Sequence, residues 1–405
     1  MRHLGGEESL DGRRELEALL SEPVEDAKRR ARESFDRLSG GRDIVLMGAG
    51  GLGRRALAGL RQHGVEPLAF ADNGIGRQGA TLDGLPILSP EAAAREFGPR
   101  AVFVVTIWGA SSPHRFAHSR EQLRALGCDV VCSFPALFWK YSDALLPFYL
   151  QDLPFRLLAD GAEVRRAFGL WEDEASRAEY VAQIRFRLNA DFDGLSHPVA
   201  HPQYFAEDLF AWSDDERVVD GGAYDGDTVR MLSALHGGRF GHVLAVEPDP
   251  ANFIRLEETV AALPPAARVK VDCLQAALGS EPSTLYLDST GTAASATSAA
   301  PSAGTIAVSA ETLDSLVEEA RTTFIKLDIE GFEVEALHGA RQTIERDAPV
   351  LAICVYHRQD HLWKIPLLLS SLRDDYALFL RPHNEEGWDL VCYAVPRVRL
   401  TSNAR

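Results

Sequence analysis

Residues 218–232 read VVDGGAYDGDTVRML, and this stretch decides the fold of the C-terminal half of the chain. An apolar strand pattern ends at Asp220, and the glycine pair that ends at Gly222 allows a tight turn. Asp225 and the residues up to Thr228 then lead into a helical pattern, where Asp and Thr are good helix caps. A strand, a glycine turn and a helix in this order predict the start of an α/β series with a parallel sheet.

The acidic character of this turn indicates the kind of ligand that it suits. Carboxylates repel a pyrophosphate, so Asp220 and Asp225 are poor partners for a dinucleotide. They suit a ligand that carries an ammonium and a sulfonium group, such as S-adenosylmethionine. A second strand pattern, HVLAVE, ends at Glu247, whose carboxylate can accept hydrogen bonds from both hydroxyls of a ribose. The alternative for Glu247 is a role in capping the next helix.

The stretch FIKLDIEGFEVEALHGA, residues 324–340, predicts a strand with an unusually polar face. Alternation along a strand puts Lys326, Asp328 and Glu330 on one face and apolar residues on the other. Three ionisable groups on one face of an interior strand are costly to bury without partners or a function. Gly331 then breaks the strand, and a helix follows.

A further strand pattern, VLAICVYHRQD at residues 350–360, is apolar over most of its length and predicts a strand buried on both faces. Tyr356 and His357 emerge at its carboxyl end, beside Asp328 if the two strands are neighbours. A lone histidine is more often structural than catalytic. Its place at a strand end beside an aspartate favours a functional role here.

Together these motifs resemble those of FkbM-type methyltransferases. The resemblance is carried by VVDGGAYDGDT, AVEPDP, FIKLDIEGFEVEALHGA, APVLAICVYH and YALFLRPHN, and it spans about Tyr204 to Pro396. It implies a class I methyltransferase fold, a seven-stranded and mostly parallel sheet with one reversed strand at its edge. It also implies two groups of site residues: Asp220, Gly222, Asp225 and Glu247 line the cofactor, whereas Asp328, Glu330 and His357 face the acceptor.

The resemblance further implies an S-adenosylmethionine-dependent methyltransferase that acts on a hydroxyl group of a sugar, a nucleotide-sugar or a natural product. We expect His357 to be the general base, with Asp328 orienting it or the acceptor. The alternative is a divalent cation, held by strand-end carboxylates and His357, that acidifies the hydroxyl. No H-x-H or C-x-x-C spacing supports such a site, so we assign no metal ligand.

A second glycine loop lies nearer the N-terminus, where MGAGGLGRRAL places Gly48, Gly50 and Gly53 between a strand pattern and a helical pattern. This G-x-G-x-x-G spacing is a dinucleotide fingerprint, and Asp72 ends the next strand, where a carboxylate could accept ribose hydroxyls. NAD is therefore one candidate ligand. The stretch FADNGIGRQGATLDGLPILSPEAA, residues 70–93, instead resembles the N-terminal domains of sugar acyltransferases, which hold nucleotide-sugars on a similar loop. A third interpretation is that the glycines only let helix and strand pack closely.

Two rival functions stay open beside the methyltransferase. The chain could be an NAD-dependent oxidoreductase that uses the loop at Gly48, but that interpretation leaves the acidic loop at 218–232 unexplained. It could also be a catalytically silent binding protein, against which the intact carboxylates at Asp220, Glu247 and Asp328 count.

The strand and helix patterns divide the chain into four parts. We expect an N-terminal helical segment at 1–40, a Rossmann-like nucleotide or nucleotide-sugar-binding domain at 41–140, a helical connector at 141–210 and a class I methyltransferase domain at 211–398. The fold class is therefore α/β, with two Rossmann-like domains joined by helices. Within the last part, residues 289–305 contain only Ser, Thr, Gly, Ala and Pro, which predicts a flexible loop.

Composition limits the partners and the compartment. A formal charge of −17 argues against a broad nucleic-acid surface, so a small-molecule acceptor fits better. No apolar run approaches the roughly 20 residues that cross a bilayer, and no apolar signal region begins the chain, so we expect no membrane partner. The five scattered cysteines contain no C-x-x-C pair, which favours free thiols in a reducing cytoplasm. The sequence leaves the oligomeric state open.

Overall fold

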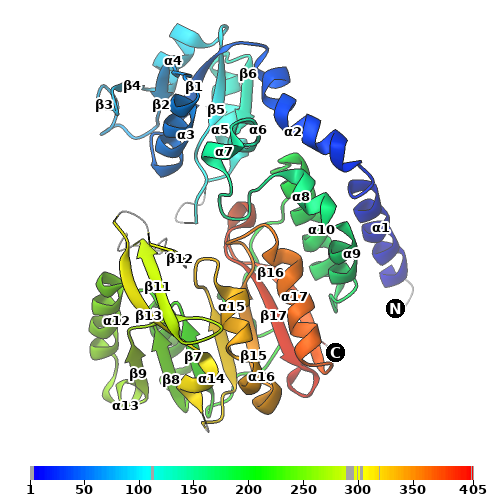
Figure 1. Cartoon of the computed structure of the whole chain (residues 1–405), viewed down its shortest axis with the longest axis vertical. Helices are drawn as coiled ribbons and strands as arrows, with labels where there is room; N and C mark the ends of the chain where they lie inside the picture. The colour runs from blue at the N-terminus through cyan, green and yellow to red at the C-terminus, as the bar shows by residue number, and fades with distance from the viewer. Residues whose placement is uncertain are drawn as a thin grey trace.

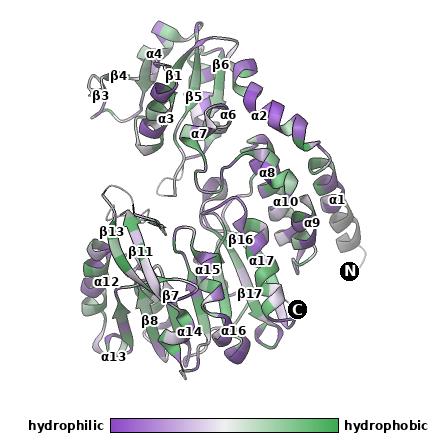
Figure 2. Ribbon diagram, viewed as in Figure 1, coloured by the Kyte–Doolittle hydropathy of each residue, from purple (hydrophilic) through white to green (hydrophobic). Residues whose placement is uncertain are grey.

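Two large sheets organise the chain, and each forms the centre of its own lobe (Figure 1). Both lobes follow from alternating apolar strands and amphipathic helices, and the strands are the greenest parts of the hydropathy view (Figure 2). The structure is a computed structural model. It describes residues 4–110, 114–288, 296–298, 300–301, 304–318, 320–402 and 404.

The N-terminal sheet has the strand order β3-β4-β2-β1-β5-β6, and its neighbouring strands are parallel except β3 with β4. Its elements are β1 (Asp43–Met47), α3 (Gly51–Gln62), β2 (Ala69–Ala71), β3 (Thr81–Leu82), β4 (Leu85–Leu88), α4 (Pro90–Phe97), β5 (Ala101–Val105), α5 (Phe116–Ala125), β6 (Val130–Ser133) and α6 (Phe134–Lys140). The strand pattern before Gly48 forms β1, and the strand that Asp72 was expected to end forms β2. The short β3 and β4 were not expected, and they fall within residues 70–93.

Helices at the N-terminus and between the two lobes pack on one another beside the sheets. They are α1 (Leu4–Leu19), α2 (Val24–Ser39), α7 (Ser142–Leu145), α8 (Pro154–Ala159), α9 (Gly161–Phe168) and α10 (Glu174–Asn189). Helix α1 contacts α10, and α2 contacts α6 and α8. The polar outer face of α2 is plain in Figure 2. The helical character expected for 1–40 and 141–210 agrees with these elements, and the boundaries of the four parts stay a prediction.

The C-terminal sheet has the order β16-β17-β15-β14-β7-β8-β9, and β17 runs opposite to the other six strands. Its elements are β7 (Arg217–Gly221), α11 (Asp227–His236), β8 (His242–Val246), α12 (Pro250–Ala262), α13 (Pro265–Arg268), β9 (Val271–Leu274), α14 (Leu313–Val317), β14 (Phe324–Leu327), α15 (Glu333–His338), α16 (Arg341–Asp347), β15 (Val350–Cys354), α17 (His361–Leu372), β16 (Tyr376–Pro382), η1 (Glu385–Gly387), β17 (Leu390–Pro396) and η2 (Arg397–Arg399). The seven-stranded, mostly parallel sheet confirms the expected fold class. One detail was wrong, because the reversed strand lies one position inside the edge strand β16.

A small four-stranded sheet, with the order β10-β13-β11-β12, branches from the chain after β9. Its strands are β10 (Ala277–Leu278), β11 (Ser283–Asp288), β12 (Ala296–Ser298) and β13 (Ile306–Glu311). Phe332 packs against its buried side chains, Ala277, Leu285 and Ala310. The predicted loop at 289–305 contains β12, while residues 289–295, 299 and 302–303 lie outside the described residues.

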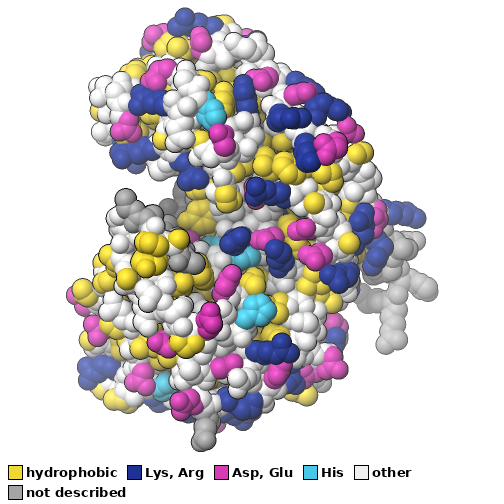
Figure 3. All heavy atoms as spheres, viewed as in Figure 1, with side chains coloured by type: hydrophobic (Ala, Val, Ile, Leu, Met, Phe, Trp, Pro, Cys, Tyr) yellow, Lys and Arg dark blue, Asp and Glu magenta, His cyan; other side chains and the backbone are white. Residues whose placement is uncertain are grey.

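Aromatic packing joins the two lobes at the carboxyl ends of both sheets. Trp108 follows β5, its ring lies 4.6 Å from that of Trp388, and its Nε1 donates to the carbonyl of Glu386 at 3.1 Å. Tyr356 follows β15, and its ring lies 5.7 Å from Trp388. Because parallel strands end at the same edge, the glycine loop after β1 faces this junction as well. Figure 3 shows a cleft between the two lobes on one side of the junction.

Candidate active site

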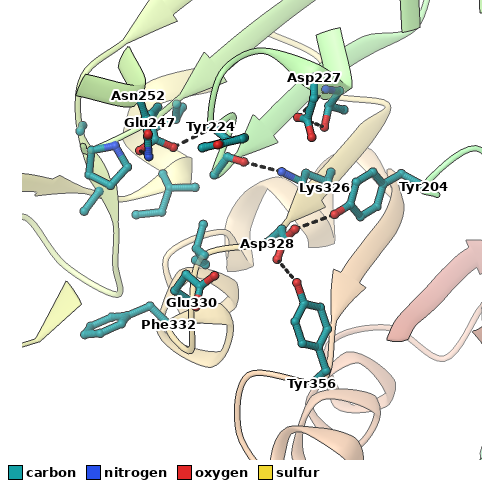
Figure 4. A pocket seen from close by; sticks show the side chains of 18 residues that line it. Tyr204, Tyr224, Asp227, Glu247, Asn252, Lys326, Asp328, Glu330, Phe332 and Tyr356 are labelled. Carbon is teal, nitrogen blue, oxygen red and sulfur yellow. Dashed lines mark hydrogen bonds between the residues drawn. The ribbon is translucent and has the colours of Figure 1, made fainter. Parts of the chain in front are cut away.

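A pocket lies at the carboxyl ends of β7, β8 and β14 (Figure 4). Its lining combines carboxylates, one lysine, aromatic hydroxyls and apolar side chains. The lining residues are Tyr204, Gly222, Tyr224, Asp227, Thr228, Val246, Glu247, Pro248, Asn252, Ala276, Ala277, Leu278, Lys326, Asp328, Ile329, Glu330, Phe332 and Tyr356.

The glycine turn after β7 forms one wall and requires glycine at its centre. Gly222 has a φ of +76°, and a Cβ there would lie 1.9 Å from the carbonyl oxygen of Asp328. Any larger residue would push the loop away from the strand β14 behind it. The turn therefore holds the backbone of residues 221–228 close to Asp328.

A buried ion pair sits beneath this wall. The Lys326 Nζ lies 3.0 Å from a carboxylate oxygen of Asp220 and donates to the carbonyl of Gly222. Both side chains are at most 2% exposed. Burial would lower the pKa of Lys326, but the carboxylates of Asp220, Asp328 and Asp227 raise it well above its usual value. The lysine thus remains a cation that neutralises Asp220 and supports the turn.

Glu247 follows β8 and forms the far end of the pocket, where its side chain is nearly buried. One oxygen accepts from the backbone N–H of Asp249 at 2.9 Å and from the Asn252 amide at 3.4 Å. The other oxygen accepts from the backbone N–H of Tyr224 at 2.9 Å. Burial raises the pKa of Glu247, and these hydrogen bonds act against that rise. They fix the orientation of the carboxylate toward the pocket.

Asp328 follows β14 directly and is held by two tyrosine hydroxyls beside a histidine. It accepts from the Tyr204 hydroxyl at 2.7 Å and the Tyr356 hydroxyl at 3.1 Å, and the His357 Nε2 lies 3.2 Å away. Figure 4 shows Asp328 between the two tyrosines. Burial would raise the pKa of Asp328, but the hydrogen bond and charge of His357, with Lys326, hold it well below its usual range. Asp328 is therefore a stable carboxylate and a weak base.

His357 lies behind the pocket wall, between carboxylates. Its Nδ1 is 2.8 Å from Glu333, its Nε2 is 3.2 Å from Asp328, and its side chain is 1% exposed. Glu333 in turn lies 3.1 Å from His361. Burial would lower the pKa of His357, but the charges of Glu333 and Glu330 raise it well above its usual value. An imidazolium has no lone pair that could take a proton, and the Nδ1 of His357 is bonded to Glu333, so this geometry does not favour the general-base role expected for His357.

Glu330 reaches the pocket from a loop, not from a strand. Strand β14 ends at Leu327, and Glu330 has a φ of +54°, in the left-handed region that non-glycine residues adopt at a cost. Its side chain is 17% exposed. Burial first, and then the nearby carboxylates, raise the pKa of Glu330 to about 7, while His357 acts in the opposite direction. Glu330 is thus a pocket carboxylate that changes charge near neutral pH.

The comparison with protein families matches this region to a known domain. Residues 220–382 match the model of the methyltransferase FkbM domain. This part of the chain is an FkbM methyltransferase domain. The match confirms the expected resemblance and supports a methyltransferase function, although the matched range ends before β17.

Solved structures and curated proteins add information on the fold. Methyltransferase FkbM from Methylobacillus flagellatus KT superimposes with a TM-score of 0.77, covering 95% of this chain and 100% of that chain at 23% identity. At this identity the likeness concerns the fold, and it extends over both lobes. A putative sugar binding protein from Salmonella typhimurium LT2 is 14% identical over 66% of this chain and 87% of that one, with a TM-score of 0.16 that carries no argument. No curated protein matches the chain.

The FkbM domain brings some of the expected site residues together and leaves others outside. Gly222, Glu247, Asp328 and Glu330 line the pocket. Three expected residues take other places: Asp220 pairs with Lys326, His357 lies behind Asp328, and the Asp225 carboxylate lies 3.7 Å from Arg230.

Other lining residues of the FkbM domain pocket were not expected as site residues. Asp227 lines the pocket in the place expected for Asp225, because helix α11 begins at Asp227. Tyr204 comes from the irregular stretch before β7, where no periodic pattern marks it. Asn252 lies in the first turn of α12. Pro250, at the start of that helix, was the feature of the sequence that could have marked this turn.

The N-terminal glycine loop has a different structure from the FkbM domain turn. A Cβ at Gly53 would lie 2.0 Å from the carbonyl oxygen of Gly48, so close packing accounts for this position. Gly48 has a φ of +114°. Asp72 accepts from the backbone N–H groups of Ala49 at 2.8 Å and Gly74 at 2.7 Å, so its carboxylate holds the loop.

A separate, open cavity lies beside this loop. Gly50 has open space around its Cα and lines the cavity with the cationic side chains of Arg54 and Arg77. Gly48, Gly53 and Asp72 are not among its lining residues. The cavity therefore offers backbone and guanidinium donors but no free carboxylate from Asp72.

The described residues show neither a cluster of metal ligands nor a helix that could span a membrane. Among residues 4–110, 114–288 and the other described ranges, no group of three or more His, Cys, Asp or Glu side chains is arranged to hold a metal ion. Within the same ranges, no helix combines the length and the apolar character needed to span a bilayer.

Proposed function

We propose that the FkbM domain transfers a methyl group from S-adenosylmethionine to a hydroxyl oxygen of a small-molecule acceptor. The observation that carries this proposal is that one pocket contains both Glu247, at the end of β8, and Glu330, after β14. Glu247 is placed to bind the ribose of a cofactor, and Glu330 is a carboxylate that can take a proton from an acceptor. A cavity that contains both suits a reaction between the cofactor and the acceptor.

The charges and the apolar lining of the pocket support S-adenosylmethionine as its ligand. Lys326 is neutralised by Asp220, which leaves Asp227 and Glu247 as acidic groups that attract a cationic ligand. Glu247 offers its remaining acceptor position to a ribose hydroxyl. Apolar side chains such as Leu278 suit the adenine ring. When bound, S-adenosylmethionine supplies a methyl group on a sulfonium, and the acceptor oxygen takes that methyl while the thioether product leaves.

Glu330 is the residue we propose as the proton acceptor. A carboxylate with a pKa of about 7 is half ionised at neutral pH and is basic enough to take the hydroxyl proton as the O–CH₃ bond forms. The charged groups that face it are the carboxylates of Asp328, Glu333 and Asp389, which raise its pKa, and the imidazolium of His357, which lowers it. His357 and Asp328 then hold the acceptor side in place and do not exchange the proton.

The acceptor class that we propose remains a sugar, a nucleotide-sugar or a natural product with a free hydroxyl. The cavity beside Gly50 favours the nucleotide-sugar, because Arg54 and Arg77 can pair with phosphate at the start of α3. The committed carboxylate of Asp72 counts against NAD, whose ribose it was expected to bind.

Calorimetry followed by turnover tests the proposal. Titration of the full chain with S-adenosylmethionine is expected to give binding, and titration with NAD is expected to give none. Radiolabelled methyl transfer to a panel of sugars and nucleotide-sugars then separates an enzyme from a silent binder. Binding of NAD without binding of S-adenosylmethionine would overturn the proposal in favour of the oxidoreductase.

A further inference from the structure

The segment before β7 brings Tyr204 into the pocket, although this residue belongs to no helix or strand. Tyr204 has a φ of +69°, in the left-handed region that a residue with a side chain adopts at a cost, so tertiary contacts must hold it there. Its backbone N–H donates to the Tyr393 hydroxyl in β17 at 3.0 Å. That hydroxyl lies 2.8 Å from His383 Nε2, and His383 Nδ1 lies 3.3 Å from the carbonyl oxygen of His201.

The partners of His383 define the direction of these hydrogen bonds. A carbonyl oxygen only accepts, so Nδ1 carries the proton and Nε2 accepts from the Tyr393 hydroxyl. Burial, which is the largest effect, lowers the pKa of His383 to about 4, in agreement with a neutral ring. The bonds connect residues 201–204 to β17 and to the end of β16, and they fix the position of Tyr204 in the pocket.

The side chain of Tyr204 contacts both charged groups of this part of the pocket. Its hydroxyl donates to the Asp328 carboxylate at 2.7 Å and accepts from the Gln203 amide at 2.9 Å. The Nζ of Lys326 lies 5.3 Å from the centroid of the ring, in a cation–π contact. Since Lys326 also pairs with Asp220, its charge is satisfied away from Asp328. Tyr204 thus holds the carboxylate and lies against the lysine.

Asp328 lies where a positive charge on the cofactor is expected. Under the proposed function, the methyl group passes from a cofactor whose ribose is at Glu247 to an acceptor beside Glu330. Asp328 lines the same pocket two residues before Glu330, and Figure 4 shows it at the centre of the group. A carboxylate near the methyl group attracts the sulfonium of S-adenosylmethionine and has no such effect on an uncharged thioether.

We propose that Tyr204 is a positioning residue for the cofactor, whose hydroxyl holds the Asp328 carboxylate toward the sulfonium of S-adenosylmethionine. Through this contact Tyr204 favours the charged cofactor over its uncharged product, S-adenosylhomocysteine. The inference rests on the proposed function, because it requires the cofactor to bind in this pocket. It gives a function to the irregular segment before β7, which packs on β17 and not on the helices around it.

The affinities for the two cofactor forms test this proposal without a known acceptor. Isothermal titration calorimetry of the full chain measures the dissociation constants of S-adenosylmethionine and S-adenosylhomocysteine, which differ by one methyl group and one positive charge. Tyr204→Phe removes the hydroxyl and keeps the ring beside Lys326. It should reduce the preference for S-adenosylmethionine over S-adenosylhomocysteine by about 2- to 12-fold, which is the contribution of one hydrogen bond. The matched control is Tyr376→Phe, which removes a buried hydroxyl that donates to Pro349 outside the pocket and should leave the preference unchanged.

A double-mutant cycle establishes whether Tyr204 acts through Asp328. Asp328→Asn alone should reduce the preference at least as much as Tyr204→Phe, and adding Tyr204→Phe to it should reduce the preference no further. Thermal denaturation shows which variants fold, and Tyr204→Phe decides alone if Asp328→Asn does not fold. A wild type that binds neither form would overturn the proposed function. A wild type that binds both, with a preference that Tyr204→Phe leaves unchanged or reduces equally without the Asp328 carboxylate, would overturn the role of Tyr204 alone.

Discussion

Replacing Glu247 by Ala is expected to weaken the binding of S-adenosylmethionine by about 10- to 150-fold. A carboxylate offers roughly four acceptor positions, and in Glu247 three of them receive Asp249, Asn252 and Tyr224. The remaining position, on the oxygen that faces Tyr224, can take one ribose hydroxyl. A single hydrogen bond to a charged group contributes about 1.5–3 kcal/mol, which corresponds to the stated loss of affinity.

Isothermal titration calorimetry of the wild type and the variant measures this loss. The matched control is Asp272→Ala, which removes a carboxylate on the neighbouring strand β9, where it pairs with His242 at 2.9 Å outside the pocket. Thermal denaturation establishes that both variants fold, since Glu247→Ala also frees two backbone N–H groups. An unchanged dissociation constant in folded Glu247→Ala would refute the assignment of the ribose to this end of the pocket.

Four other outcomes follow from the same geometry. Glu330→Gln should lower turnover by about 10²–10⁴-fold, and wild-type turnover should fall below about pH 7 as Glu330 gains its proton, which a pH–rate profile measures. Lys326→Met should destabilise the fold by about 3–5 kcal/mol in urea denaturation, because Asp220 is left as a buried, unpaired charge. Adding Asp220→Asn to the Lys326→Met variant should recover part of the lost stability. The pKa of His357 is raised in the folded protein, so its stabilising contribution is complete below the pKa of about 6.5 in the unfolded chain and is lost as the pH rises toward the pKa in the folded protein. His357→Gln should therefore cost less stability at about pH 9 than at about pH 6. Excess EDTA should leave turnover unchanged, whereas a loss that Mg²⁺ or Mn²⁺ restores would favour the metal route.

The large sheets could be predicted because their strands are apolar enough to stand out. The run VLAICVYH became β15, and all of its strand residues, Val350–Cys354, are buried. The small sheet could not be predicted in the same way. Strand β13 alternates Ile and Val with Ala and Ser, and its exposed positions outnumber its buried one, while the apolar residues of β11 are confined to the centre of a strand that begins with Ser and Thr. Such strands depend on tertiary partners such as Phe332 more than on their own pattern.

Part of the site could be predicted from the sequence, although the structure changes the reason why Glu330 belongs to it. Strand alternation placed Lys326, Asp328 and Glu330 on one face, and all three line the pocket. However, β14 ends at Leu327, so a left-handed backbone and not alternation brings Glu330 there. Sequence placed His357 at a strand end but carried no sign that Glu333 would occupy its Nδ1. That contact depends on how α15 packs, which no local pattern encodes.

Site residues from distant segments of the chain could not be predicted, because no local pattern marks them either. Tyr204 precedes the FkbM domain, and it lies in no helix or strand whose periodicity would assign it a face. Asp389 follows the turn after β16, and its proximity to Asp328 depends on the pairing of β16 with β17. A single sequence contains no local pattern from which long-range strand pairing of this kind can be predicted.

The order of strands in the C-terminal sheet has a consequence for synthesis on the ribosome. Strand β17 lies between β15 and β16, although it is made after both. Strand β16 therefore cannot join the sheet until residue 396 has emerged, while β7, β8 and β14 can already be in register. A nascent chain paused at the end of β16 carries the Glu247 side of the pocket but lacks Trp388 and its contact with Trp108. On this order of synthesis, the contact between Trp108 and Trp388 can form only after β7, β8 and β14 have been made.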